Sequence, residues 1–421
     1  MQRNPGLRTL VHKGFPIPPM SPLLGGGAAA MLQKMLEPLR SLTYLDLCFA
    51  GHLDHSSLLC LARFAKQLHS LIIYVSLICK DETSNGQEQE HTLDLESTQL
   101  RQLEVRATIS REDPTVLIPL LKASPQLEIL SFPYYDGTLV AQIIRQYCSR
   151  LRCLKFEQTG DNYKDDEMAA IINSCQTSGL QLFSSNERLG LGHRAIRALH
   201  ANSATLDTVK IPIFGYDTFI TVQRLLSSCP NLRELRVSKR LNSPSNIGKF
   251  PARELLKDPW ICERLEVLQL PIEMVHGGAV GGGNQANNPS VEPDDYHQKL
   301  YVQLGKLLWL QKLDLSFKQY LYNRTCKTSP LFSLESGLEI LEGLKQLEVL
   351  DLSGTANDIK RPELEWMCEH WTMLTQIRGS LLDSWITAAG DKTVSEDDAL
   401  ALERVSAILV ARSQPADDIY D

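Results

Sequence analysis

Large apolar residues recur along this chain in the pattern LxxLxL, in which x is any residue. Full copies begin at residues 42, 68, 100, 127, 151, 206, 232, 265, 310 and 347. Weaker copies stand at Leu7–Leu10, Leu180–Leu182 and Leu374–Ile377. Most neighbouring copies start 24–33 residues apart. Recurrence at intervals of this length indicates a repeat architecture, in which each copy supplies one short strand.

Segments with helical periodicity lie between these strands. Residues 115–123, 139–147, 193–200 and 218–227 place apolar side chains three and four positions apart. A strand, a turn, a helix and a second turn make one repeat, which cannot bury its apolar face alone. The pattern therefore predicts an α/β leucine-rich-repeat solenoid (a horseshoe), with parallel strands on the concave face and helices on the convex face.

Small side chains precede many of these strands by three positions and support the same register. This column holds Ala65, Ser97, Ser124, Cys148, Ser203, Cys229 and Cys262. A small residue suits the place where a helix turns into the next strand, which gives three cysteines a packing role.

The solenoid is expected to span residues 1–382, with insertions at about 80–96, 277–295 and 317–333. Residues 383–421 form a tail. Within it, Ser395 and the acidic residues 396–398 are typical of a helix start, and an apolar stripe follows, so a helix is expected over about 395–412. Two interpretations stay open: this helix caps the last repeat, or it binds a partner.

Composition and charge exclude several classes. The net charge of -7 is modest, and no Lys/Arg block dominates any segment, so nucleic acid is not an expected partner. No run approaches the roughly 18–20 apolar residues of a membrane span. The ten cysteines show no CxxC spacing. This suits a reducing compartment, cytoplasmic or nuclear.

Signatures of catalysis, cofactor binding and metal binding are not found in the sequence. The glycines at 277–278 and 281–283 lack the Lys-Ser/Thr that completes a phosphate loop. His52 and His55 lack further ligands for zinc. The cysteines lack a recurring His partner. We therefore expect no catalytic, cofactor or metal site.

The candidate binding residues lie at the x positions of the strands and just past the strand ends. Side chains there point away from the core, and interfaces favour Tyr and Arg. The set comprises Tyr44, Tyr74, Arg106, Tyr134, Tyr135, Lys155, Phe183, Lys210, Phe214, Tyr216, Arg236 and Lys312. Because its charge is mixed, we expect a protein partner on the concave face. The alternative is that the rings pack against neighbouring repeats.

Two stretches carry a family resemblance. The run Ser228-Cys229-Pro230-Asn231-Leu232-Arg233-Glu234-Leu235 resembles the repeats of F-box/LRR proteins of the ribonuclease-inhibitor-like class. The C-terminal stretch, with Leu347–Leu352 and then Glu365–Trp371, is similar to the ending of F-box-like proteins of early-diverging fungi. No F-box is recognisable, so docking to a ubiquitin-ligase adaptor is expected only if one lies upstream.

The resemblance implies a non-enzymatic protein-protein interaction module, namely the substrate-recognition part of an SCF-type ubiquitin ligase receptor that lacks its F-box. The alternative is a GTPase regulator resembling the Ran GTPase-activating proteins, which share the broad fold. That class needs a catalytic arginine near a strand end. Arg106 and Arg236 are the candidates for it, and the competing interpretation is that both are ion-paired residues of the solenoid.

Overall fold

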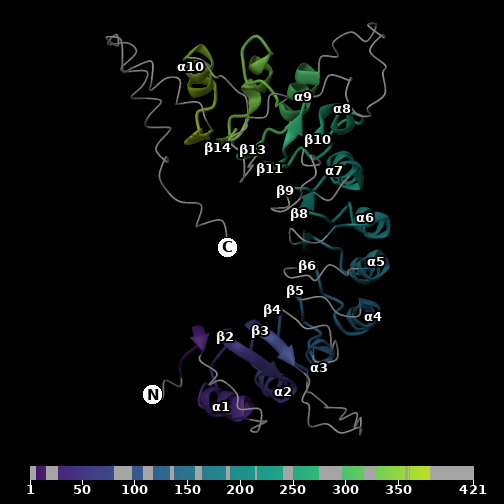
Figure 1. Ribbon diagram of the computed structural model, residues 1–421, viewed down its shortest axis with the longest axis vertical. Helices are drawn as coiled ribbons and strands as arrows, with labels where there is room; N and C mark the ends of the chain where they lie inside the picture. The colour runs from purple at the N-terminus through teal and green to yellow at the C-terminus, as the bar shows by residue number, and fades with distance from the viewer. Residues whose placement is uncertain are drawn as a thin grey trace, which may run out of the picture. The chain divides into compact units, whose positions relative to one another are not determined.

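The computed structural model describes residues 6–15, 27–79, 97–107, 117–132, 137–156, 164–185, 190–213, 216–239, 250–274, 296–316, 329–355, 359 and 361–379. The chain divides into two compact units, Met1–Leu206 and Asp207–Asp421 (Figure 1). Among the described residues, no helix has the length and apolar content needed to cross a lipid bilayer.

The first unit alternates strands with helices. Its elements are β1 (Thr9–Phe15), α1 (Gly27–Leu36), β2 (Tyr44–Asp54), α2 (His55–Phe64), β3 (Ser70–Cys79), β4 (Gln102–Ala107), α3 (Ile118–Lys122), β5 (Ile129–Ser131), α4 (Gly137–Tyr147), β6 (Cys153–Phe156), α5 (Asp165–Ser174), β7 (Leu182–Ser185) and α6 (His193–His200). Strands β1 to β7 lie in chain order, and each pairs in parallel with the next.

The second unit repeats this plan and adds a short pair of strands. Its elements are β8 (Thr208–Ile213), α7 (Tyr216–Ser228), β9 (Glu234–Lys239), β10 (Phe250–Pro251), α8 (Ala252–Leu255), β11 (Val267–Gln269), β12 (Ile272–Glu273), α9 (Tyr296–Leu304), β13 (Lys312–Asp314), the 3₁₀ helix η2 (Leu338–Gly343), β14 (Val349–Asp351), α10 (Arg361–His370) and β15 (Gln376–Arg378). The main sheet has the order β8-β9-β11-β13-β14-β15, and β10 pairs with β12 beside it.

The leucines of the repeat form continuous buried columns. In the first unit the second Leu of each copy is the Cα partner of the next, and all are fully buried: Leu45, Leu71, Leu103, Leu130 and Leu154. In the second unit the same column runs through Val209, Leu235, Leu268, Leu313 and Leu350. The parallel, in-register strands and the helices in most of the connections confirm the leucine-rich-repeat solenoid.

The weak copy at Leu180–Leu182 has a different register from the one that the sequence suggested. Phe183 is the Cα partner of Leu154 and is fully buried, whereas Leu182 is the partner of Cys153 and is half-buried. The Phe183 ring packs against Phe156, with ring centroids 5.8 Å apart. The placement of Phe183 among the binding residues was therefore wrong. A slip of one residue moves every side chain of a strand to the other face.

The column of small residues is largely buried. Ala65, Ser124, Cys148, Cys229 and Cys262 are each at most 4% exposed. Ser97 is exposed and Ser203 half-buried, and the side chains at these two turns that are buried instead are Thr98 and Asn202. At the second of these turns the buried side chain is the polar Asn202, and its amide group forms hydrogen bonds to the backbone. Its oxygen accepts from the Leu180 N–H at 3.2 Å, and its nitrogen donates to the Ala198 carbonyl at 3.0 Å.

Neighbouring repeats also cap one another's helices. The carboxylate of Asp165, the first residue of α5, accepts the N–H groups of Arg194 and Ala195 at the start of α6, at 2.7 and 2.9 Å. These donors have no partner within their own helix. Gly192 lets the two segments approach, because a Cβ there would lie 2.4 Å from the Asp165 Cγ.

Several predicted segments lie outside the described residues. These are the insertions at 80–96 and 277–295, and the tail 383–421 with its helix at 395–412. Part of the third insertion is described and belongs to the core. Phe332 is 2% exposed and packs against Tyr301, with ring centroids 5.9 Å apart.

Truncating a core leucine should destabilise the second unit strongly. Leu235→Ala removes a fully buried side chain and leaves a cavity, so the free energy of unfolding should fall by about 2–5 kcal/mol. Val302→Ala, at a position 47% exposed, serves as the control and should change it by less than about 1 kcal/mol. Urea titration followed by circular dichroism measures both. Equal effects would contradict the buried column.

Removing the cap between repeats should lower the free energy of unfolding by less than the truncation of Leu235 does, but by a measurable amount. Asp165→Ala should lower the free energy of unfolding by about 1 kcal/mol, because two N–H groups of α6 lose their acceptor. Asp166→Ala is the matched control. Asp166 forms only an exposed ion pair with Arg194, and such pairs contribute about 0–1 kcal/mol. A cost for Asp166→Ala equal to or larger than that for Asp165→Ala would refute the capping role.

Candidate functional site

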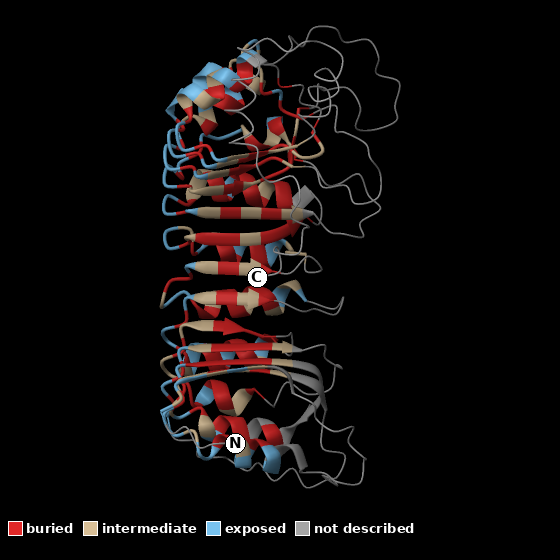
Figure 2. Cartoon of the chain, turned by 90° about the vertical axis from the view of Figure 1, so that its left-hand side faces the viewer, coloured by how far each residue is buried: buried red, intermediate tan, exposed pale blue. Residues whose placement is uncertain are grey.

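Within each unit, the parallel sheet has one face against the helices and one face that no described helix covers, here called the open face (Figure 1). Strand residues alternate between the two. In β4, Leu103 and Val105 are fully buried in the core, while Gln102 and Arg106 reach the open face half-buried. Figure 2 shows this alternation as buried and intermediate bands along the strands.

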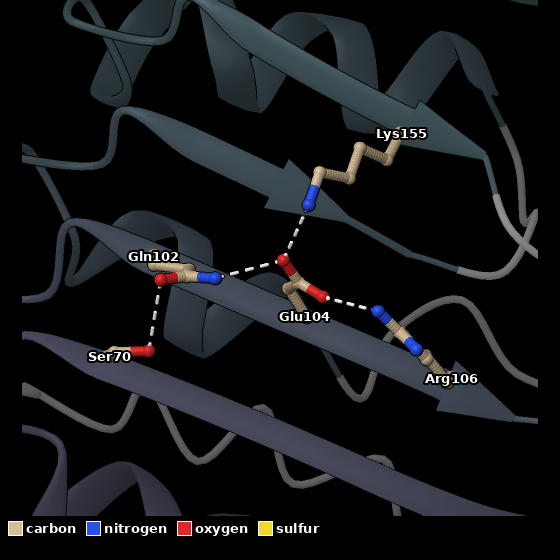
Figure 3. A network of polar contacts seen from close by, with 5 residues as sticks. All are labelled: Ser70, Gln102, Glu104, Arg106 and Lys155. Carbon is tan, nitrogen blue, oxygen red and sulfur yellow. Dashed lines mark hydrogen bonds and ion pairs between the residues drawn. The ribbon is translucent and has the colours of Figure 1, made fainter. Parts of the chain in front are cut away.

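A carboxylate lies at the centre of the open face of the first unit. Glu104 on β4 is only 3% exposed at its side chain, although it points away from the leucine core. Its Oε1 accepts from Lys155 Nζ on β6 at 2.8 Å and from Gln102 Nε2 at 2.8 Å. Its Oε2 accepts from Arg106 Nη2 at 3.1 Å (Figure 3). A buried charge requires such partners, because desolvation alone would be very costly.

The network continues through neutral groups. Ser70 Oγ on β3 donates to Gln102 Oε1 at 3.1 Å, which orients the amide so that its nitrogen faces Glu104 (Figure 3). Next to it, the Arg106 guanidinium lies 4.8 Å from the centre of the Tyr74 ring, a cation–π distance. We call these six residues the Glu104 cluster: Ser70, Tyr74, Gln102, Glu104, Arg106 and Lys155.

The cluster fixes the charge of its central carboxyl. Burial raises the pKa of Glu104, but hydrogen bonds from Lys155 and Gln102 and the charges of Lys155 and Arg106 outweigh burial. The net pKa of Glu104 is therefore below its ordinary value, and the group is ionised at neutral pH. Burial and the charges of Asp46 and Glu104 raise the pKa of the nearby Tyr44 phenol, so Tyr44 remains a hydrogen-bond donor.

Four of the predicted site residues lie together here. Tyr44, Tyr74, Arg106 and Lys155 stand on β2, β3, β4 and β6 of one open face, all half-buried. Lys155 reaches Glu104 across β5, and Ser131 is buried between them in the register of the sheet.

Three more predicted residues lie on the open face of the second unit. Lys210 and Arg236 are Cα partners and both pair with Glu234, Lys210 at 3.2 Å. Lys312 stands two strands further along. Burial lowers the pKa of Lys312, and so do the charges of Arg236 and Arg378, against the opposite effect of Asp314 and Asp351.

The other aromatic candidates are not placed. Tyr134, Tyr135 and Phe214 lie outside the described residues. Tyr216 is the first residue of α7, and its side chain is likewise outside the described part of the chain. A contact role for these four stays a prediction.

The candidate binding residues did not include Glu104, Gln102 and Ser70, which hold the cluster together, although Glu104 stands at one of the x positions expected to line the concave face. A usable signal was present. Glu104 stands between Gln102 and Arg106 at i−2 and i+2 on one face of a strand, and Lys155 occupies the equivalent position two repeats later. Parallel, in-register strands bring these positions onto one surface.

Four buried thiols have a raised pKa: Cys175 and the three cysteines of the column of small residues. Burial raises the pKa of Cys148, Cys175 and Cys262 to about 12, and that of Cys229 to about 11. Each is therefore a protonated thiol at neutral pH. Within the described ranges, no group of three or more His, Cys, Asp or Glu residues is placed to hold a metal ion.

No protein-family model and no curated protein sequence matches this chain. Among solved structures, an internalin (inlF) from Listeria monocytogenes is similar over 84% of this chain and 80% of its own. The identity is 14% and the TM-score 0.35. The fold assignment therefore stands on the strand register described above.

Neutralising the central carboxylate should make stability less dependent on pH. Glu104→Gln keeps the shape of the side chain but loses charge-assisted hydrogen bonds. The free energy of unfolding at pH 7 should therefore fall by about 1–3 kcal/mol. Because the folded pKa is lowered, this stability is present above the ordinary carboxyl pKa of about 4.3 and is lost as pH falls through the folded value.

Chemical denaturation of the two proteins between pH 7 and pH 2.5 measures this difference. The curves should converge at the acid end, and the exposed Glu348→Gln serves as the control, with little effect at any pH. A difference that stays constant down to pH 2.5 would mean that the Glu104 charge contributes nothing to it.

Proposed function

We propose that this chain is a non-enzymatic protein-binding module and that its open face holds a partner protein around the Glu104 cluster. The observation that supports this is that the carboxylate of Glu104 holds the side chains of Lys155 and Arg106 in place. Glu104 is almost fully buried, whereas the side chains of Lys155 and Arg106 are 27% and 31% exposed. The carboxylate thus holds two cationic groups at the surface in fixed positions.

Fixed side chains favour binding, because less conformational entropy is lost when a partner docks. Tyr74 and Arg106 belong to the residue types that dominate interface energetics, and they already contact each other. The nearby Tyr44 hydroxyl adds a donor that stays protonated. Mixed charge with aromatic groups suits a protein surface better than a polyanion.

In its finer form, the proposal makes this chain the substrate-recognition part of an SCF-type ubiquitin ligase receptor, with an adaptor bound only through an F-box lying upstream. The sequence resemblance of the repeats around 228–235 and 347–371 supports this form. Ubiquitin transfer would then take place on other subunits. A cytoplasmic or nuclear location is part of the same proposal, and the described cysteines are free thiols, as a reducing compartment requires.

The GTPase-regulator alternative is less well supported. It needs an arginine that can reach a nucleotide in a partner. Arg106 is bound by Glu104 and stacked on Tyr74, and Arg236 is ion-paired with Glu234. Both are thus engaged within their own sheet. Under single-turnover conditions, this chain should leave the GTP hydrolysis rate of a Ran-type GTPase unchanged.

Removing the Tyr74 ring should weaken partner binding without unfolding the chain. Tyr74→Ala should lower the affinity for a captured partner about 30-fold, equivalent to roughly 2 kcal/mol. Trp309→Ala is the matched control, since Trp309 is an aromatic side chain 61% exposed in the turn before β13. Quantitative affinity capture gives the binding ratio, and melting temperature checks the fold. If Trp309→Ala weakens capture and Tyr74→Ala does not, the partner binds elsewhere.

A further inference from the structure

On the open face of the second unit, two of the acidic side chains are buried, whereas the basic side chains are more exposed. Four basic residues stand on it: Lys210, Arg236, Lys312 and Arg378. Its carboxylates are Glu234, Asp314 and Asp351. Glu234 is ion-paired with Lys210 and Arg236, and its side chain is 21% exposed. Asp314 and Asp351 are only 3% and 1% exposed. The accessible groups on this face are therefore mainly cationic.

The two buried aspartates bond to the backbone of their own strand ends. Asp314 Oδ1 accepts the Ser316 N–H at 3.0 Å, and Asp351 Oδ1 accepts the Ser353 N–H at 3.0 Å. They are Cα partners on β13 and β14, in the row between Arg236 and Arg378, and both are almost fully buried. A ligand on this face would meet the basic side chains first, and Lys210 and Arg236 are 40% and 39% exposed.

The basic residues also have a regular spacing. Arg236 is on β9, Lys312 on β13 and Arg378 on β15, and in the sheet order β9-β11-β13-β14-β15 each is two strands from the next. Neighbouring strands lie about 4.8 Å apart, so successive basic positions are about 10 Å apart in the direction that crosses the strands. Arg236 and Arg378 stand in one row of the register, and Lys312 stands two residues earlier along its strand, in the row of Glu234. A peptide in the polyproline II conformation rises about 3.1 Å per residue and repeats every three residues, or about 9.3 Å.

We propose that the second unit docks an acidic, extended segment of a partner protein, which crosses the strands of its open face with a carboxylate at every third residue. The carboxylates would pair in turn with Arg236, Lys312 and Arg378. The binding is charge-assisted and loses little conformational entropy, because the peptide is extended before it binds. This adds a second contact surface to the protein-binding function proposed above, on which it rests, and it names the chemistry of the partner at that surface.

The direct test is fluorescence anisotropy on the full chain with two labelled heptapeptides of equal composition and charge. One has the order Glu-Pro-Pro-Glu-Pro-Pro-Glu, and the other has its three Glu residues together, followed by four Pro residues. The spaced peptide should bind at least about fivefold more tightly, and binding should weaken as salt rises. Equal affinity for the two peptides, or no binding of either at low salt, overturns the proposal.

Substitutions on the sheet identify the site. Arg236→Gln and Arg378→Gln should each weaken the spaced peptide about fivefold or more, with melting temperatures close to that of the parent. Arg233→Gln is the matched control, since Arg233 is a more exposed arginine just before β9 that pairs with Glu266 off this face. An equal loss with Arg233→Gln would point to non-specific attraction and overturn the site.

The chain's own acidic C-terminus is the competing occupant. Asp417, Asp418 and Asp421 are changed to Asn in an otherwise full-length protein. The spaced peptide should bind the parent and this variant alike. Binding to the variant alone would assign the face to the chain's own tail instead. Failure of the peptide while the Tyr74-dependent capture persists would reject this inference and leave the proposed function standing.

Discussion

The structure depends on one constraint: a single repeat cannot bury its own apolar face. Each strand carries a few leucines, and they leave water only when the equivalent leucines of the next repeat stack beside them. Leu103, for example, is fully buried between its Cα partners Leu71 and Leu130. Burial of a leucine side chain contributes roughly 1.5–3 kcal/mol, so a one-residue slip between repeats would be costly along the whole column. Register is therefore strongly specified.

The same register decides what the open face can do. Because the strands are parallel and aligned, side chains from different repeats come to lie side by side, as Glu104 and Lys155 do across β5. Both units use carboxylates that are more buried than the cations they accompany. Glu104 holds Arg106 in the first unit, and Glu234 holds Arg236 in the second. The cations exposed on the open face are thus positioned by carboxylates that are themselves more buried.

Much of the fold could be predicted from the sequence, because leucine spacing and burial obey the same period. The full LxxLxL copies, including those around Leu45, Leu235 and Leu350, are buried throughout the described chain. The weak copy at 180 was misread, since Leu180 and Leu182 suggested a register that the Phe183 ring, packed on Phe156, rules out. Capping of α6 by Asp165 could not be foreseen, because it joins two repeats whose relative rotation the sequence does not encode locally. In the site, the exposed members of the Glu104 cluster followed from strand alternation, whereas Glu104 itself looked like any surface carboxylate.

We expect the partner to bind the open face and not the helical side of the chain. Site-specific photo-crosslinking tests this most directly, with benzoylphenylalanine at position 74 on the open face or at position 31, an exposed position of α1 in the same unit. We expect a captured partner to be crosslinked from position 74 and not from position 31. Crosslinks from position 31 alone would place the interface on the helices and contradict it.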